Sequence, residues 1–180
     1  MKKILVIAVA MLLVASAVSA REGEGYLGLF ADGSHSVCSV MGTGFTPFTM
    51  WIWALDQVPG VTAIEFAINF PSNVIASTVT VNPLISVGLG TLQAGTSVAF
   101  YTCQLDWVWT HQVACYLINT SPSVITIIPD PTAVPPEYLF ARCDLGDSLF
   151  EPTIFSSLYL NQACVIATQN ASWGAIKSLF

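Results

Sequence analysis

Two tryptophan pairs, Trp51 with Trp53 and Trp107 with Trp109, have the spacing most suggestive of a binding site. Side chains two residues apart in a β-strand lie on the same face of a sheet. Exposed rings at this spacing stack on sugars or anchor a protein partner, whereas buried rings fill a core. We expect at least one pair in the core. All four residues are candidate contacts for an extracellular protein or polysaccharide.

Three residues are candidates for hydrolytic chemistry. Glycosidases use two carboxylates, which Glu65 and Asp106 could supply, and His111 could serve as a general base in a serine hydrolase. The chain has no Gly-x-Ser-x-Gly motif. Nothing in the spacing requires the three residues to meet, and His111 shares a predicted strand face with Trp109, which favours a partly buried structural histidine. We therefore predict no catalytic residue and no enzyme activity.

The acidic stretch Asp-Leu-Gly-Asp-Ser-Leu-Phe-Glu contains Asp144, Asp147 and Glu151. Calcium prefers six to eight oxygen ligands from a flexible acidic loop. The EF-hand pattern is missing, so a solvated turn is the alternative interpretation. No other cofactor is expected.

Five cysteines follow the N-terminal leader, so at least one is unpaired. Thiols outside the cytoplasm form disulfides, and short chain separation favours Cys103–Cys115 and Cys143–Cys164. Cys38 would then remain free, most simply as a buried thiol. Cysteine-ligated zinc is not expected, because the chain has no Cys-x-x-Cys pair and only two histidines.

The first twenty residues have the three parts of a signal peptide. Lys2 and Lys3 supply positive charge, 4–14 are apolar, and 15–20 are mostly small. The apolar run is about half of the ~20 residues needed to span a membrane. We predict cleavage before Arg21, a single mature domain at 21–180 without a transmembrane segment, and a secreted, periplasmic or cell-surface location.

The mature chain is acidic and sparsely charged. Three bases (Arg21, Arg142 and Lys177) stand against 11 acids, which gives a formal charge of −8. No basic patch is available to contact phosphates, so nucleic-acid binding is excluded. Few charges also weaken the electrostatic barrier to self-association.

Alternation of apolar and polar residues predicts many short strands. In 61–70, Ile64, Phe66 and Ile68 share one face, while Ala63 and Glu65 share the other, as in a half-buried strand. The stretch 107–117 alternates similarly. Further strands are predicted at 26–31, 37–41, 48–55, 75–81, 98–103, 124–128, 138–143, 154–160 and 164–167.

Turn-forming residues separate these strands, including Gly-Leu-Gly at 88–90. No helical pattern interrupts them, so we predict an all-β, antiparallel β-sandwich of the jelly-roll or cohesin/Ig-like kind. A short C-terminal turn or helix at 172–180 is expected to pack on it.

The alternating segment 61–70, followed by Pro-Ser-Asn-Val-Ile at 71–75, resembles the early strands of cohesin-like and carbohydrate-binding-module-like sandwiches. The chain as a whole, including Phe-Thr-Pro-Phe-Thr-Met-Trp-Ile-Trp at 45–53, resembles small uncharacterised exported bacterial proteins. The first resemblance implies binding of a dockerin or a polysaccharide, and no binding residue can be transferred position by position.

The leading hypothesis is a secreted, non-catalytic β-sandwich module for extracellular binding or adhesion. Two alternatives remain open: a secreted hydrolase acting on glycans, and a structural cell-envelope or surface-assembly subunit.

Overall fold

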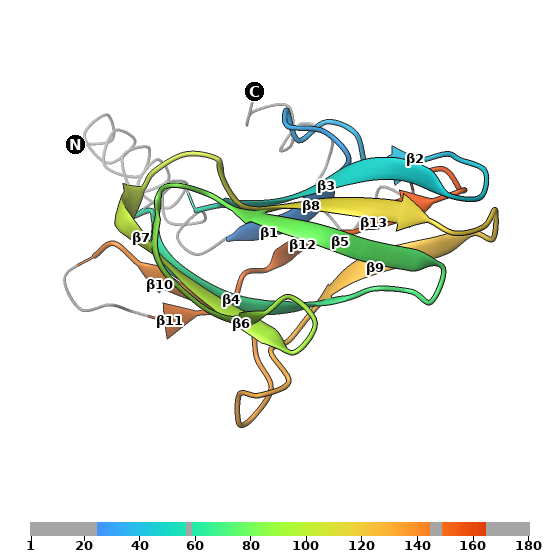
Figure 1. Ribbon diagram of the computed structural model, residues 1–180. Coiled ribbons are helices and arrows are strands. Elements are labelled where there is room, and N and C mark those ends of the chain that lie inside the picture. The colour runs from blue at the N-terminus through green and yellow to red at the C-terminus, as the bar shows by residue number, and fades with distance from the viewer. Residues whose placement is uncertain (1–24, 57–58, 145–148, 165–180) are drawn as a thin grey trace, which may run out of the picture.

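A computed structural model describes residues 25–56, 59–144 and 149–164. Within these ranges the chain forms thirteen strands in two facing layers and no helix (Figure 1). Accordingly, the described residues include no helix that could cross a membrane. The predicted signal peptide at 1–20 and the predicted turn or helix at 172–180 lie outside these ranges, as does nearly all of the strand predicted at 164–167.

The first sheet has the order β12-β1-β3-β8-β5. Strands β1 and β12 run parallel, and the other neighbours run antiparallel. Strand β5 ends the sheet as a free edge. The bounds are β12 (Ile154–Ser156), β1 (Tyr26–Phe30), β3 (Thr46–Leu55), β8 (Val108–Leu117) and β5 (Val74–Val81).

The second layer has the order β11-β10-β4-β9-β13-β2, with β7 also paired to β4 and β6 paired to β7. Strands β2 and β13 are parallel and the rest are antiparallel. The bounds are β11 (Leu149–Phe150), β10 (Leu139–Arg142), β4 (Val61–Asn69), β9 (Ser123–Ile128), β13 (Leu158–Leu160), β2 (Ser39–Val40), β7 (Gly95–Gln104) and β6 (Ile85–Thr91). The predicted all-β sandwich is confirmed.

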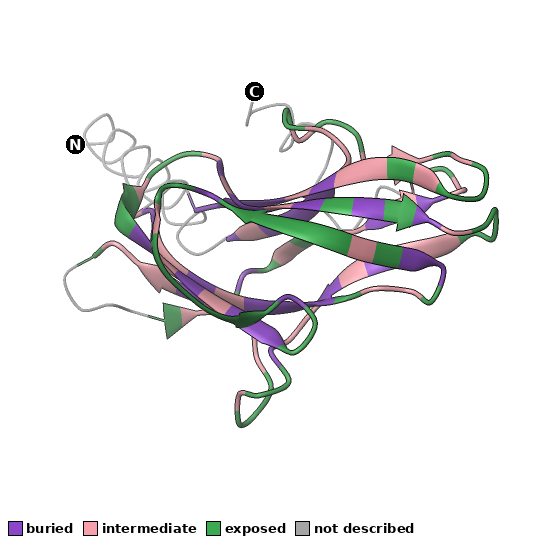
Figure 2. Ribbon diagram, in the orientation of Figure 1, coloured by how far each residue is buried: buried purple, intermediate pink, exposed green. Residues whose placement is uncertain are grey.

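The core lies between the layers, where apolar side chains from both sheets meet (Figure 2). The alternation predicted for β4 is correct, because Ile64, Phe66 and Ile68 are buried and Glu65 lies on the opposite face. Burying each such apolar side chain contributes about 1.5–3 kcal/mol. The largest fully buried side chains are Leu27, Leu29, Met50, Ile52, Ile64, Phe66, Ile68, Leu117, Ile125, Phe140, Leu158 and Leu160.

Strand β6 occupies a stretch where the sequence predicts a break. Gly88 and Gly90 have low strand propensity, yet both pair with β7, opposite Val98 and Thr96. Tertiary pairing therefore overrides the local glycine signal.

A β-bulge in β8 shows that the prediction for 107–117 is wrong, because Trp109 and His111 do not share a strand face. Ile52 pairs with His111 and Trp53 pairs with Trp109, so Thr110 is an extra residue. A bulge residue reverses the alternation of the side chains that follow it. Trp109 therefore faces outward, whereas His111 faces the interior.

Both predicted disulfides are wrong. The structure joins Cys103 to Cys143 and Cys38 to Cys164, and leaves Cys115 free and buried. Cys115 points into the core from β8, whereas Cys103 is exposed near the end of β7 in the other sheet. The parallel pairing of β2 with β13 brings Cys38 beside the end of the described chain, a relationship that chain separation alone does not reveal.

Candidate functional site

A shallow hollow of about 280 Å³ lies on the outer surface of β6, β7, β4, β10 and β11. Its lining is almost entirely apolar, and we call it the Glu65 face after the carboxylate at its centre. Figure 1 shows these strands together in the lower layer. The outward side chains of the face are Ala63, Glu65, Val87, Leu89, Ser97, Ala99, Leu139, Ala141 and Leu149.

Strand register explains why this face is concave. Val87 pairs with Ala99, Ala99 with Ala63, Ala63 with Ala141, and Ala141 with Leu149. Side chains opposite one another on adjacent strands stand side by side on one face. Three small alanines therefore form the floor, and the larger Val87 and Leu149 form exposed walls.

Glu65 is the only charged residue that lines this hollow among the described residues. It pairs with Ser97 of the neighbouring strand β7, and the Oγ of Ser97 donates a hydrogen bond to Glu65 Oε2 at 2.9 Å. The bond orients the carboxylate in an otherwise apolar surface. Such a surface can bury apolar side chains of a partner and accept one charge-assisted hydrogen bond from it.

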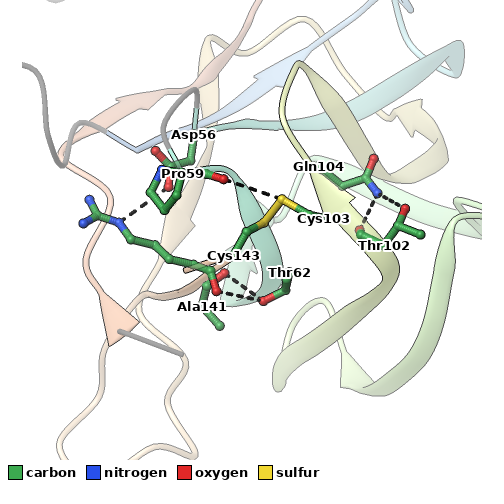
Figure 3. The surroundings of a disulfide bond; sticks show 9 residues. Asp56, Pro59, Thr62, Thr102, Cys103, Gln104, Ala141 and Cys143 are labelled. Atoms are coloured by element: carbon green, nitrogen blue, oxygen red, sulfur yellow. Dashed lines mark hydrogen bonds and ion pairs between the residues drawn. A yellow bond between two sulfur atoms is a disulfide. The ribbon is translucent and has the colours of Figure 1, made fainter. Parts of the chain in front are cut away.

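The Cys103–Cys143 disulfide holds one end of the Glu65 face together (Figure 3). It joins the ends of β7 and β10, which flank β4, with a Cα–Cα distance of 5.7 Å. Gly60 precedes β4 with φ +95°, and a Cβ there would lie 2.8 Å from Cys103 Sγ. Only glycine fits where the bridge crosses, so the spacing of these three strands is fixed.

A buried ion pair supports the same end of the face. Arg142 Nε lies 3.6 Å from Asp56 Oδ2, and the guanidinium stacks on the Phe150 ring, 4.0 Å from its centroid. Partly buried cation–π contacts of this kind contribute about 1 kcal/mol. They attach β11, which carries Leu149, to β10.

The four candidate tryptophans lie together on the outer surface of the first sheet. Met50, Ile52 and Ala54 of β3 face the core, so Trp51 and Trp53 face away from it. The expectation that one pair fills the core is therefore wrong. Trp51 contacts Trp109 with ring centroids 5.3 Å apart, and Trp53 contacts Trp107 at 6.5 Å.

The loop between β1 and β2 covers this tryptophan cluster. His35, at φ +47°, stacks on Trp107 with centroids 4.3 Å apart and meets Trp53 edge-on at 5.1 Å. Asp32 holds the loop by accepting hydrogen bonds from the N–H groups of Ser36 and Val37 at 2.9 and 2.8 Å.

Serine hydroxyls complete the Asp32 turn. The Oγ of Ser36 donates to Asp32 Oδ2 at 2.7 Å, and Ser34 Oγ donates to the same oxygen. Burial opposes ionisation of Asp32, but these bonds and the two backbone bonds outweigh it and hold its pKa well below the usual range.

The tryptophan cluster does not present one flat surface. The rings of Trp51 and Trp109 are inclined at 83°, and those of Trp53 and Trp107 at 76°. Edge-to-face rings bury one another, and Trp53 is 9% exposed. A partner-binding role for Trp51, Trp53, Trp107 and Trp109 stays a prediction.

The three hydrolytic candidates lie in different places. Glu65 is on the outer surface of one sheet, and His111 faces the interior from the other. Asp106 is in the exposed loop between β7 and β8, where it accepts the backbone N–H of Trp107 at 2.7 Å. The hollow that contains Glu65 contains neither of the other two, and the hollow that contains His111 likewise contains only that one.

The calcium prediction falls partly outside the described residues. Asp144 lies in the connection between β10 and β11, Glu151 directly follows β11, and Asp147 lies in the undescribed part of the connection. No group of three potential metal ligands occurs among the described residues. Calcium binding by Asp144, Asp147 and Glu151 stays a prediction.

Sequence comparisons find no match, whereas solved structures share the fold. No protein-family model and no curated protein matches the chain. Its structure is similar to a type III cohesin module from a cell-surface anchoring scaffoldin of Ruminococcus flavefaciens. The TM-score is 0.55 at 10% identity, covering 79% of this chain and 89% of that module. The chain has a cohesin-like fold.

Two further cohesin structures agree with this assignment. A type II cohesin domain from the Acetivibrio cellulolyticus cellulosome gives a TM-score of 0.55 at 8% identity, covering 77% of this chain and 95% of that domain. The sixth cohesin of scaffoldin B from the same organism, in complex with a Cel5 dockerin mutant, gives 0.50 at 8% identity, covering 78% and 99%. The cohesin-like resemblance of the sequence is thus confirmed at the level of fold.

The sequence identifies the centre of the Glu65 face but not its walls. The alternation of 61–70 places Ala63 and Glu65 together on the face opposite the core. Leu139 and Leu149 join them only through the pairing of β10 with β4 and β11. No local pattern encodes those pairings.

Proposed function

We propose that this chain is an exported, non-catalytic cohesin-like module that binds an extracellular protein through the Glu65 face. The concave apolar floor, walled by exposed Val87 and Leu149, is the observation that carries the proposal. Contiguous exposed apolar patches on soluble proteins mark interaction sites. The chemistry of this face suits association better than catalysis.

Two independent observations support the proposal. The similar scaffoldin B cohesin was solved in complex with a dockerin, so this fold can serve as a protein receptor. The two disulfides favour an oxidising compartment, in line with the predicted signal peptide at 1–20.

The composition of the Glu65 face restricts the partner. Apolar side chains must fill the alanine floor formed by Ala63, Ala99 and Ala141, and a donor such as lysine, arginine or a hydroxyl must reach Glu65. A partner that covered the carboxylate without adding a donor to the Ser97 bond would remove its hydration at a cost in free energy. We therefore propose a partner that presents an apolar ridge with one cationic or hydroxyl group at its centre.

The experiment uses a matched pair of surface variants in the oxidised, exported protein. Leu149 on the face and Leu105 outside it are 63% and 64% exposed, so Leu149→Asp and Leu105→Asp place the same charge at similar solvent exposure. Each protein is immobilised and exposed to culture supernatant of the producing organism. The expected result is a defined protein retained by wild type and Leu105→Asp but lost with Leu149→Asp.

The captured protein is then purified and titrated by calorimetry. We expect Glu65→Gln to weaken binding by about 2 kcal/mol if a charged donor meets the carboxylate. Equal retention by Leu149→Asp and wild type, or specific binding only on a glycan array, would overturn the proposal. Analytical ultracentrifugation of the chain alone tests the surface-assembly alternative.

A further inference from the structure

A second hollow, separate from the floor of the Glu65 face, lies between the free edges of β5 and β6. We call it the β5–β6 groove, and its volume is about 350 Å³. Strand β5 belongs to one sheet and β6 to the other, so the groove opens into the space between the layers. Figure 2 shows both strands to be largely exposed.

Gly88 leaves this space open. Val87 and Leu89 line the Glu65 face, so Gly88, which lies between them in β6, takes an inward position. Gly90 also lines the groove, but its φ of +80° would direct a Cβ against the carbonyl oxygen of Gly95 rather than into open space. A Cβ added to Gly88 would meet no atom within 4 Å. On the other wall, Val79 and Val81 pair with the inward residues Val113 and His111, yet they are 48% and 45% exposed.

The lining of the groove is apolar and uncharged. Leu89 borders both hollows. The other aliphatic and aromatic groups of the groove come from Phe70, Ala76, Val79, Val81 and Leu92. The formally neutral polar groups come from Thr91, Gln93, Thr96 and His111. The mature chain is strongly acidic, and none of the residues lining the groove is a lysine or arginine. An anionic ligand therefore has no counter-charge in the groove.

His111 supplies an oriented polar group in the groove. Its side chain is 4% exposed, its Nδ1 lies 3.1 Å from Thr110 Oγ1, and its ring contacts Phe66 edge-on. No hydrogen bond to Nε2 occurs among the described residues. Burial lowers the pKa of His111 to about 4, so at neutral pH the imidazole is uncharged.

A small molecule fits this space better than a polypeptide segment. Small-molecule sites have volumes of about 300–1,000 Å³ and combine an apolar lining with a few placed polar groups. At one end β5 and β6 are joined through Asn82, whose side-chain amide donates to Trp109 O at 2.6 Å. An added strand could not run past that closed end.

We propose that the β5–β6 groove binds a small neutral amphiphile, whose aliphatic chain lies between Gly88 and Val79 and whose hydroxyl or carbonyl oxygen hydrogen-bonds His111. The ligand class is a medium-chain alcohol or a neutral lipid of similar length. This site is distinct from protein binding at the Glu65 face, because Gly88 points to the opposite side of β6.

The test titrates the oxidised full mature chain with 1-hexanol, 1-octanol and 1-decanol by calorimetry at pH 7. Each buried CH₂ tightens binding by about fourfold, so the affinity rises steeply along the series until the groove is filled. Decanoate serves as the charged comparison. It is expected to bind more weakly than 1-decanol, because no lysine or arginine lines the groove.

Two variants locate the ligand. Gly88→Val places a branched side chain in the groove at a position where a Cβ meets no atom within 4 Å, and it is expected to abolish 1-decanol binding without lowering the melting temperature. Thr80→Val, on the outward side of β5, is the control and is expected to bind normally. His111→Phe keeps an aromatic ring but removes the ring nitrogens that can hydrogen-bond the ligand, and it is expected to weaken binding by about tenfold.

Three outcomes would overturn the proposal. These are the absence of 1-decanol binding up to its solubility limit, unchanged binding by Gly88→Val, and tighter binding of decanoate than of 1-decanol. Capture of the protein partner by Gly88→Val separates the two hypotheses, because that variant leaves the outward side chains of the Glu65 face unchanged.

Discussion

Trp109 and His111 lie on opposite sides of the first sheet although a single residue separates them. Thr110 is the extra residue of a β-bulge, and its Oγ1 lies 3.5 Å from Ile52 O on the neighbouring strand. The bulge sends the indole to the outer tryptophan cluster and the imidazole to the interior. Because of this one inserted residue, β8 contributes Trp109 to the outer tryptophan cluster and His111 to the interior.

The buried imidazole makes folding sensitive to acid. The folded pKa of His111 is about 4, below its value of 6.5 in the unfolded chain, so the unfolded state binds more protons between those pH values. The contribution of uncharged His111 to the free energy of unfolding is fully present above pH 6.5 and is lost as the pH drops toward 4. The loss is on the order of 3 kcal/mol and is measured by urea unfolding at several pH values.

The variant His111→Gln is the control for that experiment. It removes the titrating group and retains a polar side chain, so its stability should fall less steeply between pH 6.5 and 4. Parallel pH profiles for wild type and His111→Gln would contradict the assignment.

The free thiol of the folded protein is expected to be inert. Cys115 is 1% exposed, and burial raises the pKa of its thiol to about 12, so almost no thiolate forms at pH 8. Native protein should not react with a thiol reagent. Denatured protein with its disulfides intact should react with one equivalent of the reagent per chain. Labelling of Cys38 in the native state would refute the disulfide pattern.

The two disulfides should contribute unequally to stability. Cys103–Cys143 spans 40 residues and Cys38–Cys164 spans 126. In the chain-entropy account, their removal costs about 4 and about 5 kcal/mol, respectively. Double cysteine-to-alanine variants compared by guanidinium unfolding test this order. The reverse order would show that native-state contacts outweigh loop length.

The loop over the tryptophan cluster depends on Asp32. The variant Asp32→Ala removes its bonds to Ser34, Ser36 and Val37, which should cost about 1–2 kcal/mol. Release of His35 from Trp107 should increase acrylamide quenching of tryptophan fluorescence. Glu137→Ala, which removes a partly exposed acid from another loop, is the control. Unchanged quenching in Asp32→Ala would show that the loop keeps its position without the carboxylate.

Local patterns in the sequence predict strands well and their partners poorly. The alternation in 61–70 places Ile64 and Glu65 on the correct faces, because a period of two is a property of the strand itself. The strand β6 is missed because Gly88 and Gly90 weaken its local signal. The reversal at Thr110 is missed because a bulge depends on register with the neighbouring strand.

The candidate sites show the same division. Glu65 stands out in the sequence as an acid flanked by alanines on a polar strand face. The walls of its hollow come from β6, β10 and β11, which long-range pairing assembles. The disulfide between Cys103 and Cys143 likewise depends on both strands flanking β4, which short chain separation does not indicate.

The Cys38–Cys164 bridge has a mechanical consequence. It closes a covalent ring with a sequence separation of 126 residues, so tension applied outside the ring is carried by the sulfur–sulfur bond. Roughly 430 Å of extended chain stays stored inside the ring while the bond is intact. An oxidised molecule stretched from its two ends would lengthen only through residues outside the ring.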